Sequence, residues 1–193
     1  FGGDGTLMHA EHLYPGIPKI LLKHSLICKK CSPLTNEEII ESVGKGNYAI
    51  ENLITLQTKV DGKVITGIND IVVRNHNHRH AMRYRLTVNG KTIPHEIIGD
   101  GIVVATPFGS TAYYRSITDS FFETGIGLAF NNSTERFDHM ILDVASTITL
   151  EVTRGPAIIY ADNQEESVVL ETGSVVTIAK GERVAQIVIP RAV

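Results

Sequence analysis

Two dipeptides that favour tight hairpin turns lie between runs of strand-forming residues in the middle of the chain. Asp61-Gly62 lies between residues 50–60 and 63–73, and Asn89-Gly90 lies between residues 82–88 and 91–98. Asp-Gly and Asn-Gly are favoured in two-residue hairpins because both turn positions take a positive φ. The pattern therefore predicts antiparallel hairpins and a body built largely of sheet.

The second half of the chain continues this pattern of short strands. The further expected strands are residues 139–142, 147–152, 157–161, 168–170, 174–179 and 184–189. Many short strands at near-regular spacing are typical of a β-sandwich. We expect residues 47–193 to form a β-rich, β-sandwich-like domain, in which the polar residues 74–79 form an exposed loop.

The first 46 residues have the alternation of an α/β domain. Residues 7–14 have helical spacing, residues 18–23 form a short apolar run, and Thr35 with Glu38 forms a capping box before a helix that ends at Gly44. Strands separated by helices indicate a parallel sheet. The fold class is thus α/β plus all-β, with a partial α/β nucleotide-binding domain at residues 1–46. Phe1 directly precedes a glycine turn, so we expect an upstream βαβ unit to be missing.

Composition excludes two classes of partner. The formal net charge is −3 and the sequence pI is about 6.2, so no basic field indicates a nucleic-acid partner. No apolar run approaches the ~20 residues that span a bilayer, and no signal-peptide pattern opens the chain. We expect a cytoplasmic protein with no membrane partner.

Cys28 and Cys31 are the two cysteines of the chain, and they form a Cys-x-x-Cys pair. The spacing leaves three interpretations open: free structural thiols, which we favour, a disulfide or redox pair, or a metal site completed by histidines. No metal-ligand residues are assigned from the sequence.

The chain opens with the glycine turn Gly2-Gly3-Asp4-Gly5-Thr6. Glycine lets a backbone approach a phosphate closely, and a helix N-terminus favours negative charge. An acid beside phosphates suggests a task, such as accepting a hydroxyl proton or holding Mg²⁺. The alternative is a surface turn in which Asp4 caps the helix.

Two further turns in the β-rich part carry an acid. Asn69-Asp70 precedes a strand, and an Asn-Asp pair suits binding of a base, a carboxamide or a ribose; the alternative is a β-bulge with side-chain-to-backbone turn bonds. Asp100 precedes the apolar strand 102–105, which leads into Thr106-Pro107-Phe108-Gly109-Ser110-Thr111-Ala112-Tyr113. We expect Ser110 or Thr111 to be the N-cap of a helix that runs to about Ser116.

These three turns together resemble the NAD kinase family. Its members carry Gly-Gly-Asp-Gly-Thr, an Asn-Glu or Asn-Asp pair, and Gly-Asp-Gly leading into Thr-Pro-Thr-Gly-Ser-Thr-Ala-Tyr. This chain has the same order and separation and differs in the last string at Phe108, where the family usually has threonine. The resemblance covers about residues 1–116.

The resemblance implies an ATP-dependent NAD kinase that phosphorylates the 2′-hydroxyl of the NAD adenosine ribose to give NADP. Asp4 would be the catalytic residue that activates this hydroxyl. The residues implied to lie against phosphates are Gly2, Gly3, Gly5 and Thr6, and those implied to hold NAD are Asn69, Asp70, Asp100, Thr111, Ala112, Tyr113 and Ser116. It also implies Mg²⁺ or another divalent cation with ATP, ATP or polyphosphate as donor, and a homodimer or homotetramer.

Several segments depart from the family pattern. The Gly-Gly-Pro and Pro-His-x-Leu-Ser segments are absent from residues 117–133, and residues 23–28 replace the usual Leu-Gly-Phe. Asp162-Asn163-Gln164 resembles the family's Asp-Gly-Gln turn, with Asn163 in place of the glycine, and asparagine tolerates a positive φ. The departures keep one alternative open, a catalytically inactive NAD-binding or nucleotide-binding module. The Gly-Gly-Asp-Gly-Thr turn, versions of which diacylglycerol kinases share, keeps a second one open, a lipid kinase of the diacylglycerol type.

Overall fold

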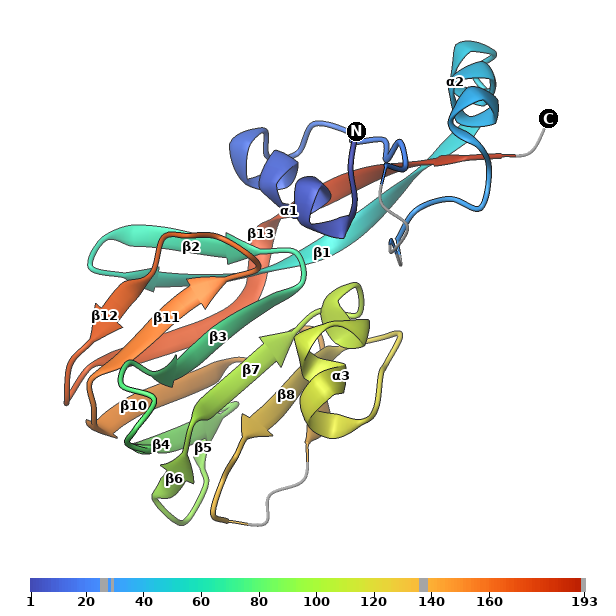
Figure 1. The fold of residues 1–193 in the computed structure, drawn as a ribbon. Coiled ribbons are helices and arrows are strands. Elements are labelled where there is room, and N and C mark those ends of the chain that lie inside the picture. Colours follow the sequence, from blue (N-terminus) through green and yellow to red (C-terminus); the bar gives the residue numbers. More distant parts are fainter. Residues whose placement is uncertain (25–27, 29, 136–138, 192–193) are drawn as a thin grey trace. The chain divides into compact units, whose positions relative to one another are not determined.

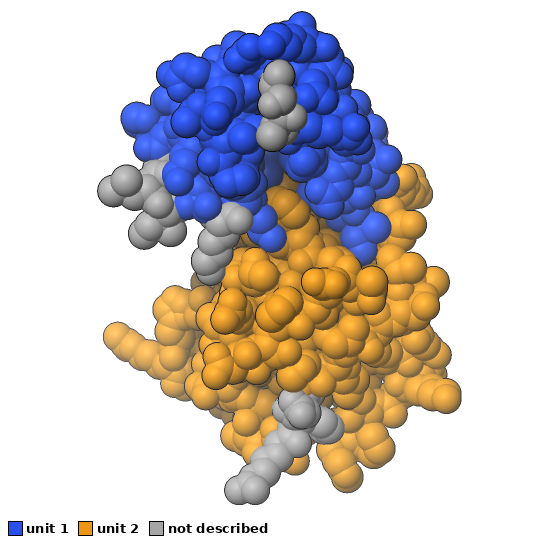
Figure 2. All heavy atoms as spheres, turned by 90° about the vertical axis from the view of Figure 1, so that its right-hand side faces the viewer, with its two compact units in different colours: residues 1–54, 183–193 blue, residues 55–182 orange. Residues whose placement is uncertain are grey.

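The structure is a computed structural model that describes residues 1–24, 28, 30–135 and 139–191. The chain forms two compact units (Figure 2): unit 1 contains residues 1–54 and 183–193, and unit 2 contains residues 55–182. The domain boundary after residue 46 stays a prediction.

Helices are few and strands dominate, as Figure 1 shows. The helices that the structure describes are α1 (Asp4–Leu13), α2 (Asn36–Gly44) and α3 (Tyr113–Thr118), with the 3₁₀ helix η1 (Gly109–Thr111). The strands are β1 (Tyr48–Val60), β2 (Lys63–Gly67), β3 (Asp70–Asn75), β4 (Met82–Val88), β5 (Lys91–Thr92), β6 (Ile97–Gly99), β7 (Gly101–Ala105), β8 (Ile126–Asn131), β9 (Met140–Leu142), β10 (Ile148–Arg154), β11 (Ala157–Ala161), β12 (Val168–Leu170) and β13 (Val175–Pro190). No helix in the described ranges is long and apolar enough to cross a membrane.

Two sheets pack face to face in unit 2. One sheet has the order β2-β1-β13-β10-β4-β5, with β6 also pairing with β4, and the other has the order β12-β11-β3-β7-β8-β9. Their shared core takes alternate residues from both sheets, for example Leu86 and Leu150 from the first and Val73 and Val104 from the second. The predicted β-sandwich-like fold is confirmed.

Both predicted hairpin turns form. Asp61 and Gly62 take φ values of 49° and 79°, and Asn89 and Gly90 take 50° and 75°. The expected strand 63–73, however, is interrupted at residues 68–69, because β2 and β3 belong to different sheets. This interruption positions the Asn69 turn at the start of β3.

The other strand predictions need four corrections. The expected run 91–98 is divided into β5 and β6, which pair separately with β4. Residues 174–179 and 184–189 belong to one strand, β13, which continues through Gly181. Thr55 packs closely against Gly181, where a Cβ would lie only 2.2 Å from Thr55 Oγ1. The sequence reading missed β8, whose residues are buried on both faces and do not alternate. The predicted loop 74–79 is exposed from residue 76 onward, but its first two residues belong to β3.

The helices of unit 1 follow the sequence closely. The predicted capping box of α2 is confirmed: the Glu38 amide donates to Thr35 Oγ1 (3.2 Å) and the Thr35 amide donates to Glu38 Oε2 (2.7 Å). Helix α1 begins at Asp4 rather than at Leu7, so Asp4 lies in its first turn.

The expected strand 18–23 is wrong as a continuous strand. Its residues make isolated parallel bridges to two different partners, Gly2 with Lys23 and Lys19 with Ile187. No continuous ladder forms because the two bridges lead to separate segments. The parallel direction of both bridges agrees with an α/β arrangement.

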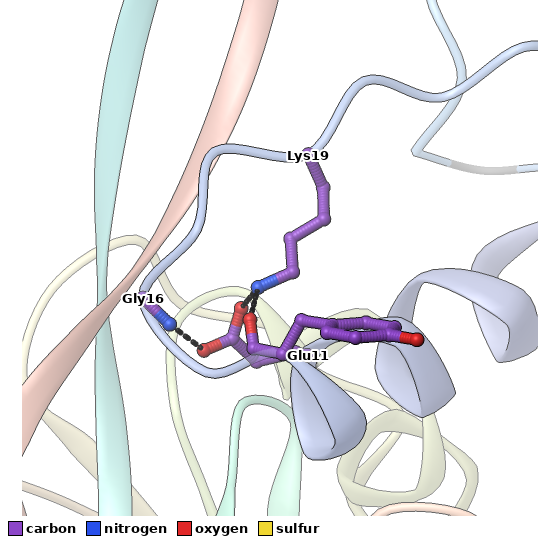
Figure 3. Close-up of polar contacts among 4 residues, drawn as sticks. Glu11, Gly16 and Lys19 are labelled. Carbon is purple, nitrogen blue, oxygen red and sulfur yellow. Dashed lines mark hydrogen bonds and ion pairs between the residues drawn. The ribbon is translucent and has the colours of Figure 1, made fainter.

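The exposed turn after α1 is fixed by a largely buried ion pair (Figure 3). Lys19 Nζ donates to Glu11 Oε2 and to the Tyr14 carbonyl, while Glu11 Oε1 accepts from the Gly16 amide at 2.9 Å. The Lys19 and Glu11 side chains are 10% and 11% exposed. The pair therefore ties the end of α1 to the segment that follows it.

Cys28 and Cys31 form a disulfide, with their Cα atoms 5.5 Å apart. The favoured interpretation of free thiols is therefore wrong, and the disulfide alternative is correct. In the described part of the chain, no group of three or more His, Cys, Asp or Glu side chains could hold a metal ion.

Candidate functional site

The glycine turn of unit 1 is closely packed. The Gly2 amide donates to the Leu22 carbonyl (3.0 Å), and a Cβ on Gly2 would lie 2.2 Å from Thr6 Oγ1. Helix α1 starts directly after Gly3, and no side chain caps its N-terminus. The amides of Thr6 and Leu7 bond back to the Gly3 carbonyl. Gly2 therefore has a steric reason to be glycine, and the turn delivers Asp4 at the start of a ten-residue helix.

The Asp4 carboxylate contacts the loop that carries the disulfide. The Lys30 amide donates to Asp4 Oδ1 at 3.1 Å, and Cys28 Sγ lies 3.2 Å from the same oxygen. Because a sulfur in a disulfide carries no hydrogen, the second contact is not a hydrogen bond. Asp4 is thus partly buried and oriented by residues that the glycine turn itself does not contain.

In unit 2, the Asn69 turn is held from one side by Asp162. The Asp162 carboxylate accepts hydrogen bonds from three successive backbone amides, those of Ile68 (2.9 Å), Asn69 (2.8 Å) and Asp70 (3.1 Å). The Asp162 amide in turn donates to the Asp70 carbonyl (3.0 Å). Three bonds to one ionised carboxylate fix the backbone of the turn strongly.

The β7–η1 loop holds the same turn from the other side. The Thr106 amide donates to the Asn69 carbonyl (2.8 Å), and Thr106 Oγ1 donates to the Ile68 carbonyl. The Gly109 amide donates to Thr106 Oγ1 at 3.1 Å. A Cβ on Gly109 would lie 2.1 Å from the Asn69 carbonyl oxygen, so no other residue fits here without moving the turn.

The side chains of this turn have unusual environments. Asn69 is 8% exposed, and its Oδ1 is buried without a hydrogen-bond partner. Burial, together with the neighbouring Asp162 carboxylate, raises the pKa of Asp70 from 3.8 to about 7. A buried acceptor without a partner costs free energy. The turn thus offers one unused carboxamide acceptor and one carboxyl group whose pKa lies far above the usual range of an aspartate.

The helix cap after β7 differs from the prediction. Neither Ser110 nor Thr111 caps the helix: both belong to η1, and Ala112 is the N-cap of α3 without a side-chain bond. The Ser110 hydroxyl lies instead within hydrogen-bond distance of two carbonyls, those of Pro107 (2.8 Å) and Phe122 (2.9 Å), to either of which its single hydrogen can be donated. The Ser110 hydroxyl therefore bonds one or the other of these carbonyls and does not cap the helix.

The remaining predicted residues of this segment lie on α3 and η1, over strands β7 and β8 (Figure 1). Tyr113 is half-buried, and its hydroxyl accepts a hydrogen bond from Asn131 Nδ2 at 3.0 Å. Ser116 is exposed and donates to the Tyr113 carbonyl (2.7 Å), Ala112 is exposed, and Thr111 is half-buried.

Asp100 lies apart from the Asn69 turn. It precedes β7, whereas Thr106 follows that strand, so about 20 Å of strand separates them at ~3.3 Å per residue. Its carboxylate accepts from Asn75 Nδ2 and from Asn132 Nδ2, both at 3.1 Å. A role of Asp100 in NAD binding stays a prediction, and the contacts observed here join the end of β3 to the residues before β7 and after β8.

A polar group on the outer face of the sheet that contains β3 was not predicted from the sequence. Arg74 and Asp70 lie on the same face of β3, and Tyr160 on β11 is opposite Val72 between them. Burial raises the pKa of Tyr160, and the negative charges of Tyr113 and Asp70 raise it further. A hydrogen bond with Arg74 lowers it. Arg74 Nη2 also bonds His78 Nδ1 at 2.9 Å. Strand alternation alone could have placed Arg74 on the same face of β3 as Asp70.

In the turn at residues 162–164, the positive φ is at Asp162 (51°) and not at Asn163. Residues 25–27, part of the segment that departs from the family pattern, lie outside the described residues.

Comparison with known proteins gives the class to which this arrangement belongs. Residues 68–189, more than half of the chain, match the model of the ATP-NAD kinase C-terminal domain. The match begins one residue before Asn69 and includes both the β7–η1 loop and Asp162. The chain therefore belongs to the NAD kinase family.

Relatives of known name agree with this membership. The chain is 30% identical over 120 residues to an NAD kinase from Rickettsia felis, covering 60% of this chain and 47% of that protein. It is 36% identical over 125 residues to a bifunctional NADP phosphatase/NAD kinase from Methanocaldococcus jannaschii, covering 60% of this chain and 21% of that protein. The chain thus matches about half of the length of the first and about a fifth of the second.

Solved structures show the same fold. Yeast NADH kinase complexed with NADH superposes with a TM-score of 0.84 at 21% identity, over 98% of this chain and 60% of that one. An NAD kinase from Archaeoglobus fulgidus in complex with ATP superposes with a TM-score of 0.76 at 21% identity, over 96% of this chain and 74% of that one.

Proposed function

We propose that this chain is part of an NAD kinase that transfers the γ-phosphoryl group of ATP to the 2′-hydroxyl of the NAD adenosine ribose. The observation that carries the proposal is the Asn69 turn, which Asp162, Thr106 and Gly109 fix from two sides while Asn69 Oδ1 has no partner. A rigid turn with an unused acceptor is what recognition of an amino or hydroxyl donor requires.

Each predicted residue has a role in this proposal. Asp4 accepts the proton of the 2′-hydroxyl as it attacks, which is general base catalysis. The amides of the glycine turn at residues 2–6 and the N-terminus of α1 favour the negative charge of phosphates. Asn69 and Asp70 bind the base or ribose of NAD through their carboxamide and carboxyl groups. Further contacts to NAD come from Asp100, Thr111, Ala112, Tyr113 and Ser116.

The ligands follow from the relatives. Yeast NADH kinase was solved with NADH, and the Archaeoglobus fulgidus NAD kinase was solved with ATP. Mg²⁺ would enter with ATP as part of the substrate and neutralise charge on its phosphates. Polyphosphate is the alternative donor. We further propose that the protein acts in the cytoplasm as a homodimer or homotetramer.

NAD affinity in an Asn69 variant tests the proposed binding site. Asn69→Ala should weaken NAD binding by ~1–3 kcal/mol, because donor groups of the ligand lose their buried partner. Isothermal titration calorimetry measures this. Asn52→Ala is the matched control, since Asn52 is exposed on β1 and bonds Gln186 outside the proposed site. Unchanged NAD affinity in both Asn69→Ala and Asp70→Ala would remove the pair from the site.

The raised pKa of Asp70 predicts a pH-dependent stability. The pKa is 3.8 in the unfolded chain and about 7 in the folded one, so the folded state binds more protons between these values. The free energy of unfolding therefore falls as pH rises from 4 to 7, by on the order of 4 kcal/mol from this group alone. Asp70→Asn should remove this decline.

Urea unfolding of both proteins at pH 5 and pH 8 checks the prediction. We expect the variant to gain stability relative to the wild type at pH 8, where Asp70 is charged and buried. Identical pH profiles of the two proteins would show that Asp70 does not titrate with a raised pKa.

A further inference from the structure

The disulfide loop contacts the carboxylate to which we assign catalysis. Cys28 Sγ lies 3.2 Å from Asp4 Oδ1, and the amide of Lys30, inside the four-residue loop, donates to the same oxygen at 3.1 Å. The Cys28–Cys31 bond closes that loop. The loop and the first turn of α1 are 24 and more residues apart in sequence, so this contact is a tertiary one that the bond helps to hold.

The bridge has the properties of a reducible pair. Cys-x-x-Cys is the spacing of many thiol–disulfide redox pairs. Both cysteines are only partly buried, and Cys31 also lines a cavity of about 280 Å³ together with Leu21, Leu34 and Ile187. Neither cysteine therefore belongs to the buried core.

We propose that Cys28 and Cys31 are redox-controlled positioning residues for Asp4, an inference that rests on the catalytic role proposed for Asp4. A dithiol of the thioredoxin class reduces the bridge: the S–S bond breaks, two thiols form, and the reductant becomes a disulfide. Two electrons and two protons pass to Cys28 and Cys31. No other reactant is needed.

Reduction changes two interactions of Asp4. The Cys28 sulfur gains a hydrogen and donates it to Asp4 Oδ1, which is already within reach at 3.2 Å. The opened loop also no longer fixes the Lys30 amide on that oxygen. A carboxylate that accepts a thiol hydrogen bond and is less well oriented is a weaker base for the 2′-hydroxyl. The disulfide form is therefore the faster one.

The test compares the disulfide and dithiol forms of the protein. NADP formation should fall about tenfold on reduction, the size expected when one hydrogen bond in the transition state is altered. Mass spectrometry after alkylation verifies zero or two blocked thiols in each sample. Cys31→Ser keeps the Cys28 thiol beside Asp4, so it should be slow with or without reductant. Cys28→Ala has no donor there and should also lose the response to reductant.

A second readout separates this inference from the proposed function. The NMR signal of the Asp4 side-chain carboxyl carbon should shift between the two forms, whether or not the protein makes NADP. If neither form makes NADP, the proposed function fails, and this signal alone decides the inference. Equal turnover of both forms, an unshifted carboxyl signal, or a Cys31→Ser variant that still responds to reductant would overturn it.

Discussion

Replacing Asp4 with asparagine is expected to lower turnover of NAD by about 100-fold or more, with NAD binding largely retained. Asparagine keeps the shape of the side chain but cannot accept the proton of the attacking hydroxyl, and general base catalysis typically contributes 10²–10⁴-fold. Steady-state assays of NADP formation give the turnover, and calorimetry gives the NAD affinity. The loss should therefore be in kcat rather than in binding.

The control for this variant is Glu37→Gln. Glu37 is an exposed acid in the first turn of α2, as Asp4 is an acid in the first turn of α1, so the change removes the same charge from an equivalent place in another helix. We expect Glu37→Gln to have wild-type turnover. If Asp4→Asn also turned NAD over at the wild-type rate, Asp4 would not be the base.

Replacing Gly109 with alanine should damage the Asn69 turn directly. The added Cβ would lie 2.1 Å from the Asn69 carbonyl oxygen and 2.4 Å from its carbonyl carbon, both backbone atoms that cannot rotate away. We expect a loss of about 3 kcal/mol or more in the free energy of unfolding, which is at the upper end for overpacking. NAD affinity should fall about tenfold or more as Asn69 is displaced.

Gly44→Ala is the matched control, because a Cβ at the end of α2 meets no atom within 4 Å. Urea unfolding and calorimetry of both variants check the prediction. A Gly109→Ala protein with wild-type stability and wild-type NAD affinity would mean that the turn is not as tightly packed as described.

Turns and helix caps whose residues lie within a few positions of one another could be predicted from the sequence. Asp61-Gly62 and Asn89-Gly90 gave hairpins because their positive φ values are a property of the turn itself. The capping box at Thr35 formed because its partner is three residues away. Strand β8 was missed since burial on both faces removes the alternation that marks a strand.

Interactions between residues that are far apart in the sequence could not be predicted from local patterns. Asp162 holds the Asn69 turn from more than 90 positions away, and no local pattern connects the two. The same holds for Gly109, whose need to be glycine comes from the backbone of Asn69. The resemblance to NAD kinases drew attention to Asn69, Asp70 and Tyr113, and the structure added Thr106, Arg74 and Tyr160 around them.

The proposed NAD kinase activity is tested most directly by measuring NADP formation by the disulfide form of the protein, supplied with NAD, ATP and Mg²⁺. An enzyme that reduces NADP but not NAD detects the product, and it also shows that the new phosphate is on the 2′ position. We expect NADP to accumulate in proportion to protein and to time, and to accumulate about 100-fold or more slowly with Asp4→Asn. NAD binding without any NADP formation, with ATP and with polyphosphate alike, would contradict it and would indicate a nucleotide-binding module instead.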